Sequence, residues 1–233
     1  MQKIFLLHGW TQSKDTPQKW EPFIKLLRKR GIEPVLLKLP GLTTPLKEVW
    51  TLEDYVQWLK KALSKETTVT LLGHSFGGQI CIRFTAKYPE KVKKLILLDS
   101  AGIRNNTPQA VIKRTVFLVL AKTGKAVFSN ESLRKALYKV AREHDYEKAS
   151  PILRKTFINV LNTDVTENLK HIHCPTTIIW GGQDRTTPTF MARKLHSAVV
   201  NSSLHYIANA RHSPQFTCPE EVAEIVAKFV KSS

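Results

Sequence analysis

Short apolar runs alternate with longer amphipathic stretches along the first part of the chain and again near its end. Runs of this length that are apolar on both faces predict buried strands, and stretches with apolar residues three or four apart predict helices. The predicted strands are 3–7, 34–39, 68–72, 94–98, 176–180 and 204–208. The predicted helices are 18–30, 52–63, 76–88, 189–199 and 220–230.

This alternation favours an α/β fold, a mostly parallel sheet flanked by helices on both faces. The pattern changes after the strand that ends at Asp99, because no strand-like run occurs from about 103 to 169. Helix-like segments replace it at 109–121, 131–143, 151–162 and 167–170. The segment from about 103 to 169 is too long to be an ordinary connection between a strand and the next element. We expect a core of residues 1–100 and 172–233, interrupted by an all-helical cap, or lid, of residues 101–171.

The composition is that of a globular protein, with 42% hydrophobic and 24% charged residues in a chain of 233. No apolar stretch approaches the roughly 20 residues that span a bilayer, and the N-terminus has no signal-peptide core. A cytoplasmic protein without a membrane span is therefore expected. The cysteines, Cys81, Cys174 and Cys218, are far apart and suggest neither a disulfide framework nor a metal site. We expect no metal and no organic cofactor.

The formal net charge of +17 raises the question of a nucleic-acid partner. The basic residues occur in short groups, mostly on the polar faces of predicted helices, and no nucleic-acid recognition motif accompanies them. A solvated basic surface is the favoured interpretation, and an acidic substrate or an acidic carrier protein is the alternative. Arg104, Lys113 and Arg114 in the cap are candidates for binding such a substrate.

The stretch LLGHSFGGQI, residues 71–80, places Ser75 between Gly73 and Gly77. This Gly-x-Ser-x-Gly spacing lies between a predicted strand and a predicted helix, the context in which a serine projects from a tight turn as a nucleophile. Side chains two positions before and after the serine would collide in such a turn. The backbone N–H of Phe76 at the helix start would face an oxyanion on a bound carbonyl. The alternative is a structural glycine turn.

A serine hydroxyl needs a general base, and His212 is the best placed of the eight histidines. It lies in the polar loop NARHSPQ after the last predicted strand. Ligands of parallel sheets bind outside the carboxyl ends of the strands, so His212 is expected at the same edge as Ser75. Plain solvent exposure of a loop histidine is the alternative.

Two aspartates follow predicted strands and qualify as the carboxylate that orients the histidine. Asp184 lies in the loop WGGQDRTTP, and Asp99 ends the strand LILLD. We favour Asp184, because its glycine-rich polar loop suits an exposed acceptor. The order Ser75, Asp184, His212 is the one expected for this architecture. A second oxyanion donor is the backbone N–H of Trp10, which follows the first strand in His8-Gly9-Trp10.

With these pieces in order, the chain resembles the α/β-hydrolase superfamily. LLHGW is similar to its oxyanion loop, LLGHSFGG to its nucleophile elbow, IIWGGQDRTTP to its acid loop and ARHSPQFTCPEEVAEIVAKFV to its histidine loop and closing helix. Two features depart from the family pattern. The family's usual first two strands are missing, which implies a sheet of about six strands, and LPGLTTP replaces the commoner Leu-Pro-Gly-His-Gly-x-Ser.

The resemblance also bears on the reaction. Members that open epoxides or remove halides carry aspartate at the nucleophile, and members that cleave carbon–carbon bonds often carry asparagine before the serine, where this chain has His74. The elbow looks most like those of esterases, thioesterases and lipases with a small helical cap. We predict a serine hydrolase that cleaves small-molecule carboxylic esters through an acyl-enzyme. A thioesterase or esterase acting on an acidic carrier protein, a C–C or amide hydrolase, and a non-enzymatic binding protein are the alternatives.

Overall fold

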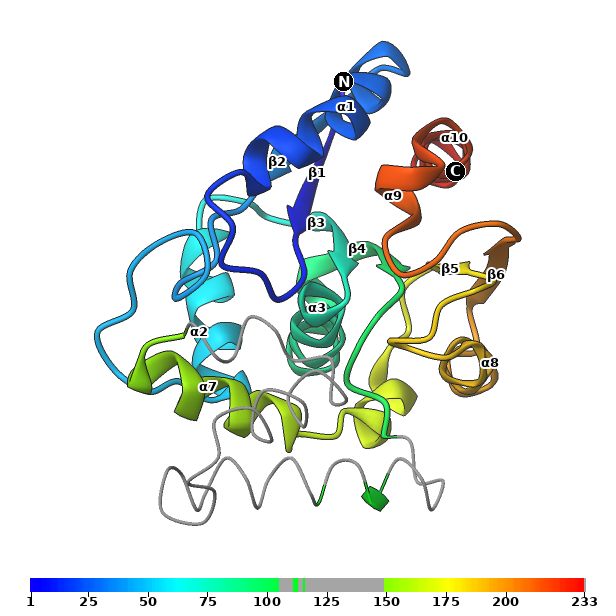
Figure 1. Ribbon diagram of the computed structural model, residues 1–233. Helices are drawn as coiled ribbons and strands as arrows, with labels where there is room; N and C mark the ends of the chain where they lie inside the picture. The colour runs from blue at the N-terminus through cyan, green and yellow to red at the C-terminus, as the bar shows by residue number, and fades with distance from the viewer. Residues whose placement is uncertain (105–110, 113–114, 116–148, 233) are drawn as a thin grey trace.

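The computed structural model describes residues 1–104, 111–112, 115 and 149–232 (Figure 1). Within them the chain forms one six-stranded sheet in the order β2-β1-β3-β4-β5-β6, in which every neighbouring pair is parallel. The strands are β1 (Gln2–Leu7), β2 (Ile32–Leu36), β3 (Val69–His74), β4 (Val92–Leu98), β5 (Thr176–Gly181) and β6 (Ser202–Ile207). The predicted parallel sheet of about six strands is confirmed.

The strand bounds differ most from prediction in β2, which runs from Ile32 to Leu36 rather than over 34–39. Proline lacks an N–H and is tolerated in a strand at the edge of a sheet, and β2 is an edge strand. Pro34 is therefore an interior residue of β2, paired with Ile4 of β1, and does not mark the start of the strand.

Helices cover both faces of the sheet (Figure 1). On one face, α1 (Thr16–Lys29) and α10 (Pro219–Lys231) pack against Leu6, Leu72 and Ile96. On the other face, α2 (Leu52–Ala62), α3 (Phe76–Lys87) and α8 (Thr189–Ala198) pack against Leu7, Leu71 and Leu95. Consecutive strand residues thus enter opposite cores, which explains why the strands are apolar at nearly every position.

The described part of the predicted cap includes α7 (Pro151–Leu161) and the 3₁₀ helix η3 (Thr166–His171). The Gln79 side chain on α3 donates from Nε2 to the carbonyls of Val160 and Thr163, at 3.2 and 2.9 Å, and so fixes the end of α7 to the core. The predicted helix 131–143 lies outside the described residues, as does 109–121 apart from 111, 112 and 115.

Two shorter helices complete the described elements: the 3₁₀ helix η1 (Pro89–Lys91) before β4 and α9 (Pro214–Thr217) before α10. Among all described residues, no helix combines the length and apolar character needed to cross a membrane.

Candidate active site

Ser75 lies at the turn between β3 and α3 in a strained backbone conformation, with φ 52° and ψ −116°. A positive φ is uncommon for a residue with a side chain, and such residues cost about 1–3 kcal/mol and cluster at functional sites. The Ser75 N–H donates to the Leu98 carbonyl of β4 at 3.0 Å, and the Ser75 carbonyl accepts from the Ala101 N–H at 3.0 Å. The turn is therefore held rigidly against the end of β4.

The glycines around Ser75 are required by close backbone contacts. A Cβ on Gly73 would lie 2.6 Å from the Gly77 carbonyl oxygen, and a Cβ on Gly77 would lie 2.2 Å from the Leu7 carbonyl oxygen. Neither distance is compatible with a side chain. The collision predicted for residues two positions before and after Ser75 is thus present, and it includes the end of β1 as well as the turn itself.

His212 and Asp184, which follow β6 and β5, are hydrogen-bonded: Nδ1 of His212 lies 2.7 Å from Oδ2 of Asp184. An ionised carboxylate only accepts, so the imidazole must donate its Nδ1–H. In the neutral ring Nε2 is then free of hydrogen and can accept a proton. The His212 side chain is 21% exposed and that of Asp184 is fully buried.

Asp184 has three further donors. Its Oδ1 accepts the N–H groups of Thr186 and Thr187, at 2.7 and 3.1 Å, and its Oδ2 accepts the Thr187 hydroxyl at 2.6 Å. Burial alone would raise the pKa of Asp184, but the hydrogen bonds and the charge of His212 outweigh it and hold the pKa below its usual value. Asp184 is therefore an ionised, fixed acceptor for the imidazole.

The loop that carries Trp10 packs directly on the turn that carries Ser75. A Cβ on Gly9 would lie 2.9 Å from Nδ1 of His74 and 3.1 Å from Cβ of Ser75. The Trp10 and Phe76 rings are in edge contact, with centroids 5.2 Å apart. The two predicted oxyanion donors thus come from neighbouring segments. The first N–H groups of a helix have no intrahelical acceptor, so that of Phe76 at the start of α3 suits this role.

The segment that replaces the commoner family motif also reaches this loop. Thr43 Oγ1, from LPGLTTP, lies 3.4 Å from Nε2 of His8, while Nδ1–H of His8 donates to the Gly9 carbonyl at 2.8 Å. Burial lowers the pKa of His8, against the effect of that bond. His8 thus connects the Trp10 loop with the segment after β2.

Asp99, the other candidate for the acid, accepts hydrogen bonds from different groups than Asp184 does. It is fully buried after β4 and accepts the Gly181 N–H on Oδ1 and the Ser213 N–H on Oδ2, both at 2.8 Å. Among the described residues, its carboxylate makes no hydrogen bond to the His212 ring. Burial raises the pKa of Asp99 to about 6, partly offset by these two bonds. The His212 ring is therefore hydrogen-bonded to Asp184 and not to Asp99.

Ser75 and His212 are connected through their sequence neighbours. Nε2 of His74 lies 3.1 Å from Oγ of Ser213, and the His74 and His212 rings have centroids 5.0 Å apart. No hydrogen bond joins Oγ of Ser75 to His212 within the described part of the chain. Such contacts often form only when substrate is bound. Burial, followed by the proximity of His212, holds the pKa of His74 well below its ordinary value.

Sequence reasoning missed Thr187, His74 and Ser213 as parts of this site. Thr187 had a readable signal, because an aspartate followed by threonines two and three positions later is typical of a turn closed by the aspartate side chain. No sequence signal pointed to Ser213, because its left-handed conformation (φ 95°) depends on contacts with distant parts of the chain.

The basic residues suggested for an acidic substrate are only partly described. The Arg104 guanidinium donates to the Asn162 carbonyl at 2.6 Å and lies 3.9 Å from the Asp164 carboxylate, so it is engaged at the end of α7. Lys113 and Arg114 lie outside the described residues, as do the apolar cap residues 116–120.

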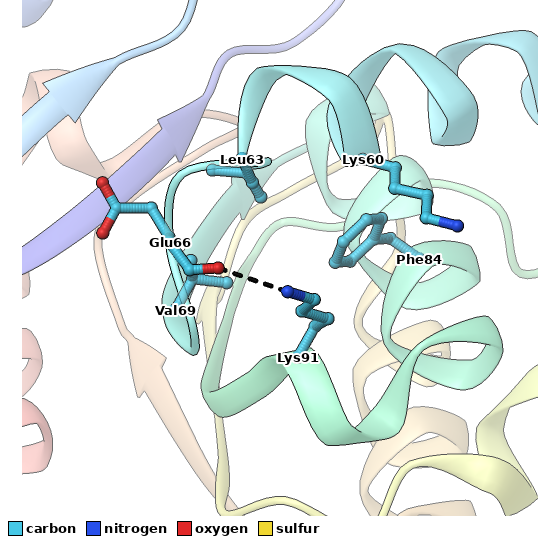
Figure 2. A pocket seen from close by; sticks show the side chains of 6 residues that line it. All are labelled: Lys60, Leu63, Glu66, Val69, Phe84 and Lys91. Carbon is cyan, nitrogen blue, oxygen red and sulfur yellow. Dashed lines mark hydrogen bonds between the residues drawn. The ribbon is translucent and has the colours of Figure 1, made fainter.

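A separate hollow lies away from these residues. Figure 2 shows its lining, which consists of Lys60, Leu63, Glu66, Val69, Phe84 and Lys91. Val69 is the first residue of β3, so this hollow is at the amino end of the strand whose carboxyl end carries Ser75. The Lys91 ammonium donates to the Glu66 carbonyl at 3.3 Å across it. It therefore does not belong to the Ser75 site.

The fold and this edge of the sheet define an α/β protein of the hydrolase type. Comparison with known families agrees: residues 4–225 match the model of the alpha/beta hydrolase family. The chain belongs to this family and is a hydrolase.

Known relatives match over nearly the whole chain. An uncharacterized hydrolase, YugF of Bacillus subtilis, is 26% identical over 99% of this chain and 90% of its own length. Mouse monoacylglycerol lipase ABHD6 is 24% identical over 98% of this chain and 75% of its own. The Escherichia coli 2-hydroxy-6-oxononadienedioate/2-hydroxy-6-oxononatrienedioate hydrolase is 26% identical over 97% of this chain and 86% of its own length. Among solved structures, a bacterial membrane phospholipase A aligns with a TM-score of 0.74 at 22% identity, covering 100% of this chain and 80% of that one.

Proposed function

We propose that this protein is a serine hydrolase that cleaves carboxylic esters through an acyl-enzyme. The observation that carries the proposal is the 2.7 Å hydrogen bond from His212 to Asp184. It leaves Nε2 of His212 as a proton acceptor at the sheet edge where the turn presents Ser75. A turn built only for structure would not need a buried carboxylate to orient a neighbouring imidazole.

The proposed reaction has two halves. Oγ of Ser75 attacks the ester carbonyl carbon while Nε2 of His212 takes the hydroxyl proton, and the N–H groups of Trp10 and Phe76 bind the oxyanion. The tetrahedral intermediate collapses, and His212 gives its proton to the departing alcohol. A water molecule then attacks the acyl-enzyme, again losing its proton to His212, and the carboxylic acid leaves as Ser75 regains its proton. Each oxyanion donor contributes on the order of 3 kcal/mol to lowering the barrier.

Two relatives support different substrates. The mouse relative is named for a lipase reaction on monoacylglycerol, an ester, and the Escherichia coli relative for hydrolysis of an oxo acid. Ester cleavage is favoured, because His74 stands before Ser75 where the carbon–carbon hydrolases of the family often have asparagine. A C–C hydrolase with the same three residues is the second candidate.

The decisive experiment compares the wild-type protein with Ser75→Ala and with Ser64→Ala, a control on an exposed serine. We expect a fluorophosphonate probe to label the wild type and Ser64→Ala, and to leave Ser75→Ala unlabelled and inactive on p-nitrophenyl esters. A panel of esters, thioesters, amides and vinylogous 1,5-diketones then separates the candidate reactions. Full esterase activity in Ser75→Ala would refute the proposal.

The net charge of +17 supports a further part of the proposal, preference for an acidic substrate or an acyl group on an acidic carrier protein. We expect kcat/KM for an anionic ester to fall with added salt while that of a neutral ester of equal size stays constant. Equal salt dependence for both would exclude the preference. We also propose a cytoplasmic location, which fractionation of cells that express the full-length protein would test.

A further inference from the structure

We propose that Asp99 is a positioning residue that holds the loops of Asp184 and His212 together on one carboxylate and stabilises the charged imidazole during the reaction. The acid loop is residues 181–187 and the histidine loop is residues 208–213. The inference rests on the proposed function, since it assigns a role within the same site. Asp99 acts through these loops and does not itself touch the reacting atoms.

The two carboxylate oxygens of Asp99 accept hydrogen bonds from two different loops. Oδ1 accepts from the Gly181 N–H, at the start of the acid loop, and Oδ2 accepts from the Ser213 N–H, at the end of the histidine loop, both at 2.8 Å. Each bond joins a charged acceptor to a backbone donor, the stronger class of hydrogen bond. A single fully buried side chain therefore connects both loops.

The second support is the closeness of the two loops beside this carboxylate. A Cβ on Gly181 would lie only 2.3 Å from the Arg211 carbonyl oxygen, so the two backbones are in direct contact just before His212. The Gln183 N–H also donates to the Ala210 carbonyl, at 2.9 Å. A movement of either loop is thus passed on to the distance between Asp184 and His212.

The third support is backbone strain at the residue after the proposed base. Ser213 has φ 95° and ψ 57°, a left-handed conformation that a residue with a side chain adopts at a cost. Its N–H is held by Asp99 and its Oγ by Nε2 of His74, the neighbour of Ser75. Asp99 thus helps to maintain a conformation that the chain would otherwise leave, and that conformation sets the direction of His212.

The fourth support is electrostatic. One oxygen of Asp99 and one ring nitrogen each of His74 and His212 lie within 4.8 Å of one another. The groups that face Asp99 are therefore His212, His74 and Asp184, and the charge of His8 acts on His74. His74 is neutral, so the protonated His212 ring is the cation that the Asp99 charge favours. Its removal would take away a negative charge close to the imidazolium that forms during the reaction.

The test is Asp99→Asn, with Asp15→Asn as a control on an exposed aspartate whose side chain caps no helix. An asparagine has one accepting oxygen, so its amide group would oppose one of the two N–H donors. For a p-nitrophenyl ester we expect kcat to fall by about tenfold with KM nearly unchanged, because positioning is lost and binding is kept. We expect the acid limb of kcat/KM to move to lower pH, because a negative charge near the imidazolium is lost. Asp15→Asn keeps the wild-type profile.

A purely structural role would lower activity without moving the acid limb, so a fall in kcat with an unchanged limb overturns the proposal, as does a wild-type kcat. Asp99→Ser, which also removes the charge, replaces Asp99→Asn if thermal unfolding shows that the latter does not fold, and the same shift of the acid limb is expected.

The proposed function and the role of Asp99 are refuted by different results. A wild-type protein that is not labelled at Ser75 by a fluorophosphonate refutes the proposed function, whereas labelling of Asp99→Asn at the wild-type rate refutes only the role of Asp99.

Discussion

The rings of Trp10 and Phe157 are packed together, with centroids 4.7 Å apart. Trp10 follows β1 and carries one proposed oxyanion donor, and Phe157 lies on α7 in the predicted cap. The Trp10 ring also contacts Phe76, whose N–H is the other proposed donor. The side chains of both donor residues therefore belong to one aromatic cluster, to which α7 contributes Phe157. We expect the position of α7 to influence the proposed oxyanion site.

The contact between Trp10 and Phe157 predicts that a conservative change on α7 alters the rate. Phe157→Leu keeps an apolar side chain but removes the ring that fixes Trp10. We expect kcat on a small ester to fall by about tenfold, since one displaced oxyanion donor costs up to about 3 kcal/mol. Ile152→Leu on the same helix is the control. A kcat equal to wild type, measured at a temperature where both variants are folded, would show that α7 does not position Trp10.

The bond between Asp184 and His212 predicts a large and specific loss in Asp184→Asn. An asparagine can donate its amide hydrogen to Nδ1 and so stabilise the tautomer that has its hydrogen on Nε2, which cannot accept the Ser75 proton. We expect kcat to fall by about 10⁴-fold, the loss typical of this exchange in a serine triad, while circular dichroism stays unchanged. Loss of less than about tenfold would indicate that the imidazole is oriented by another group.

Asp99 predicts a pH dependence of stability with a defined sign. Burial raises its pKa in the folded protein from 3.8 to about 6, so the folded state binds the proton more tightly than the unfolded state. Its contribution to stability is then present below about pH 4 and is lost as the pH rises through 6. Since one pKa unit corresponds to 1.36 kcal/mol, the loss is about 3 kcal/mol.

Urea unfolding of the wild type and of Asp99→Asn between pH 4 and pH 7 measures this effect. We expect the stability of the wild type relative to the variant to decrease by about 2 kcal/mol over that range, because at pH 4 the unfolded carboxyl is already partly ionised. The lowered pKa of Asp184 acts below pH 4, where stability is lost as that carboxylate is protonated, so it does not disturb the measurement. A difference that does not change with pH would mean that Asp99 titrates normally.

Much of this arrangement could be predicted from sequence because it depends on local rules. Ser75, Asp184, His212 and Trp10 each follow an apolar run, and parallel strands bring such positions to one edge of a sheet. The polar loop around Asp184 brings its carboxylate to Nδ1 of His212. The choice of Asp184 over Asp99 as the acid stays a prediction.

The remainder depends on contacts between distant segments. Ser213 adopts φ 95° because Asp99 and His74 hold it, and neither partner is near it in sequence. Lys94 is similar: its position in β4 suggests an exposed lysine, yet it is 5% exposed, and its ammonium donates to the carbonyls of Phe229 and Val230 at the end of α10. The hydrophobic periodicity of the sequence does not indicate which helix end will pack over a given strand residue.

The contact between Gly77 and β1 predicts that Gly77→Ala is far more damaging than an ordinary glycine replacement. The added methyl group would lie 2.2 Å from the Leu7 carbonyl oxygen, so α3 would have to move away from the sheet. We expect a loss of more than about 4 kcal/mol in the free energy of unfolding, a size reserved for severe core disruption.

Gly31→Ala is the matched control, because a methyl group there would have only the Lys231 ammonium nearby, at 4.0 Å. Its φ of 74° should cost about 1–2 kcal/mol through backbone strain alone. Equal losses in the two variants would show that α3 can shift and that the close contact with β1 is not what requires glycine at position 77.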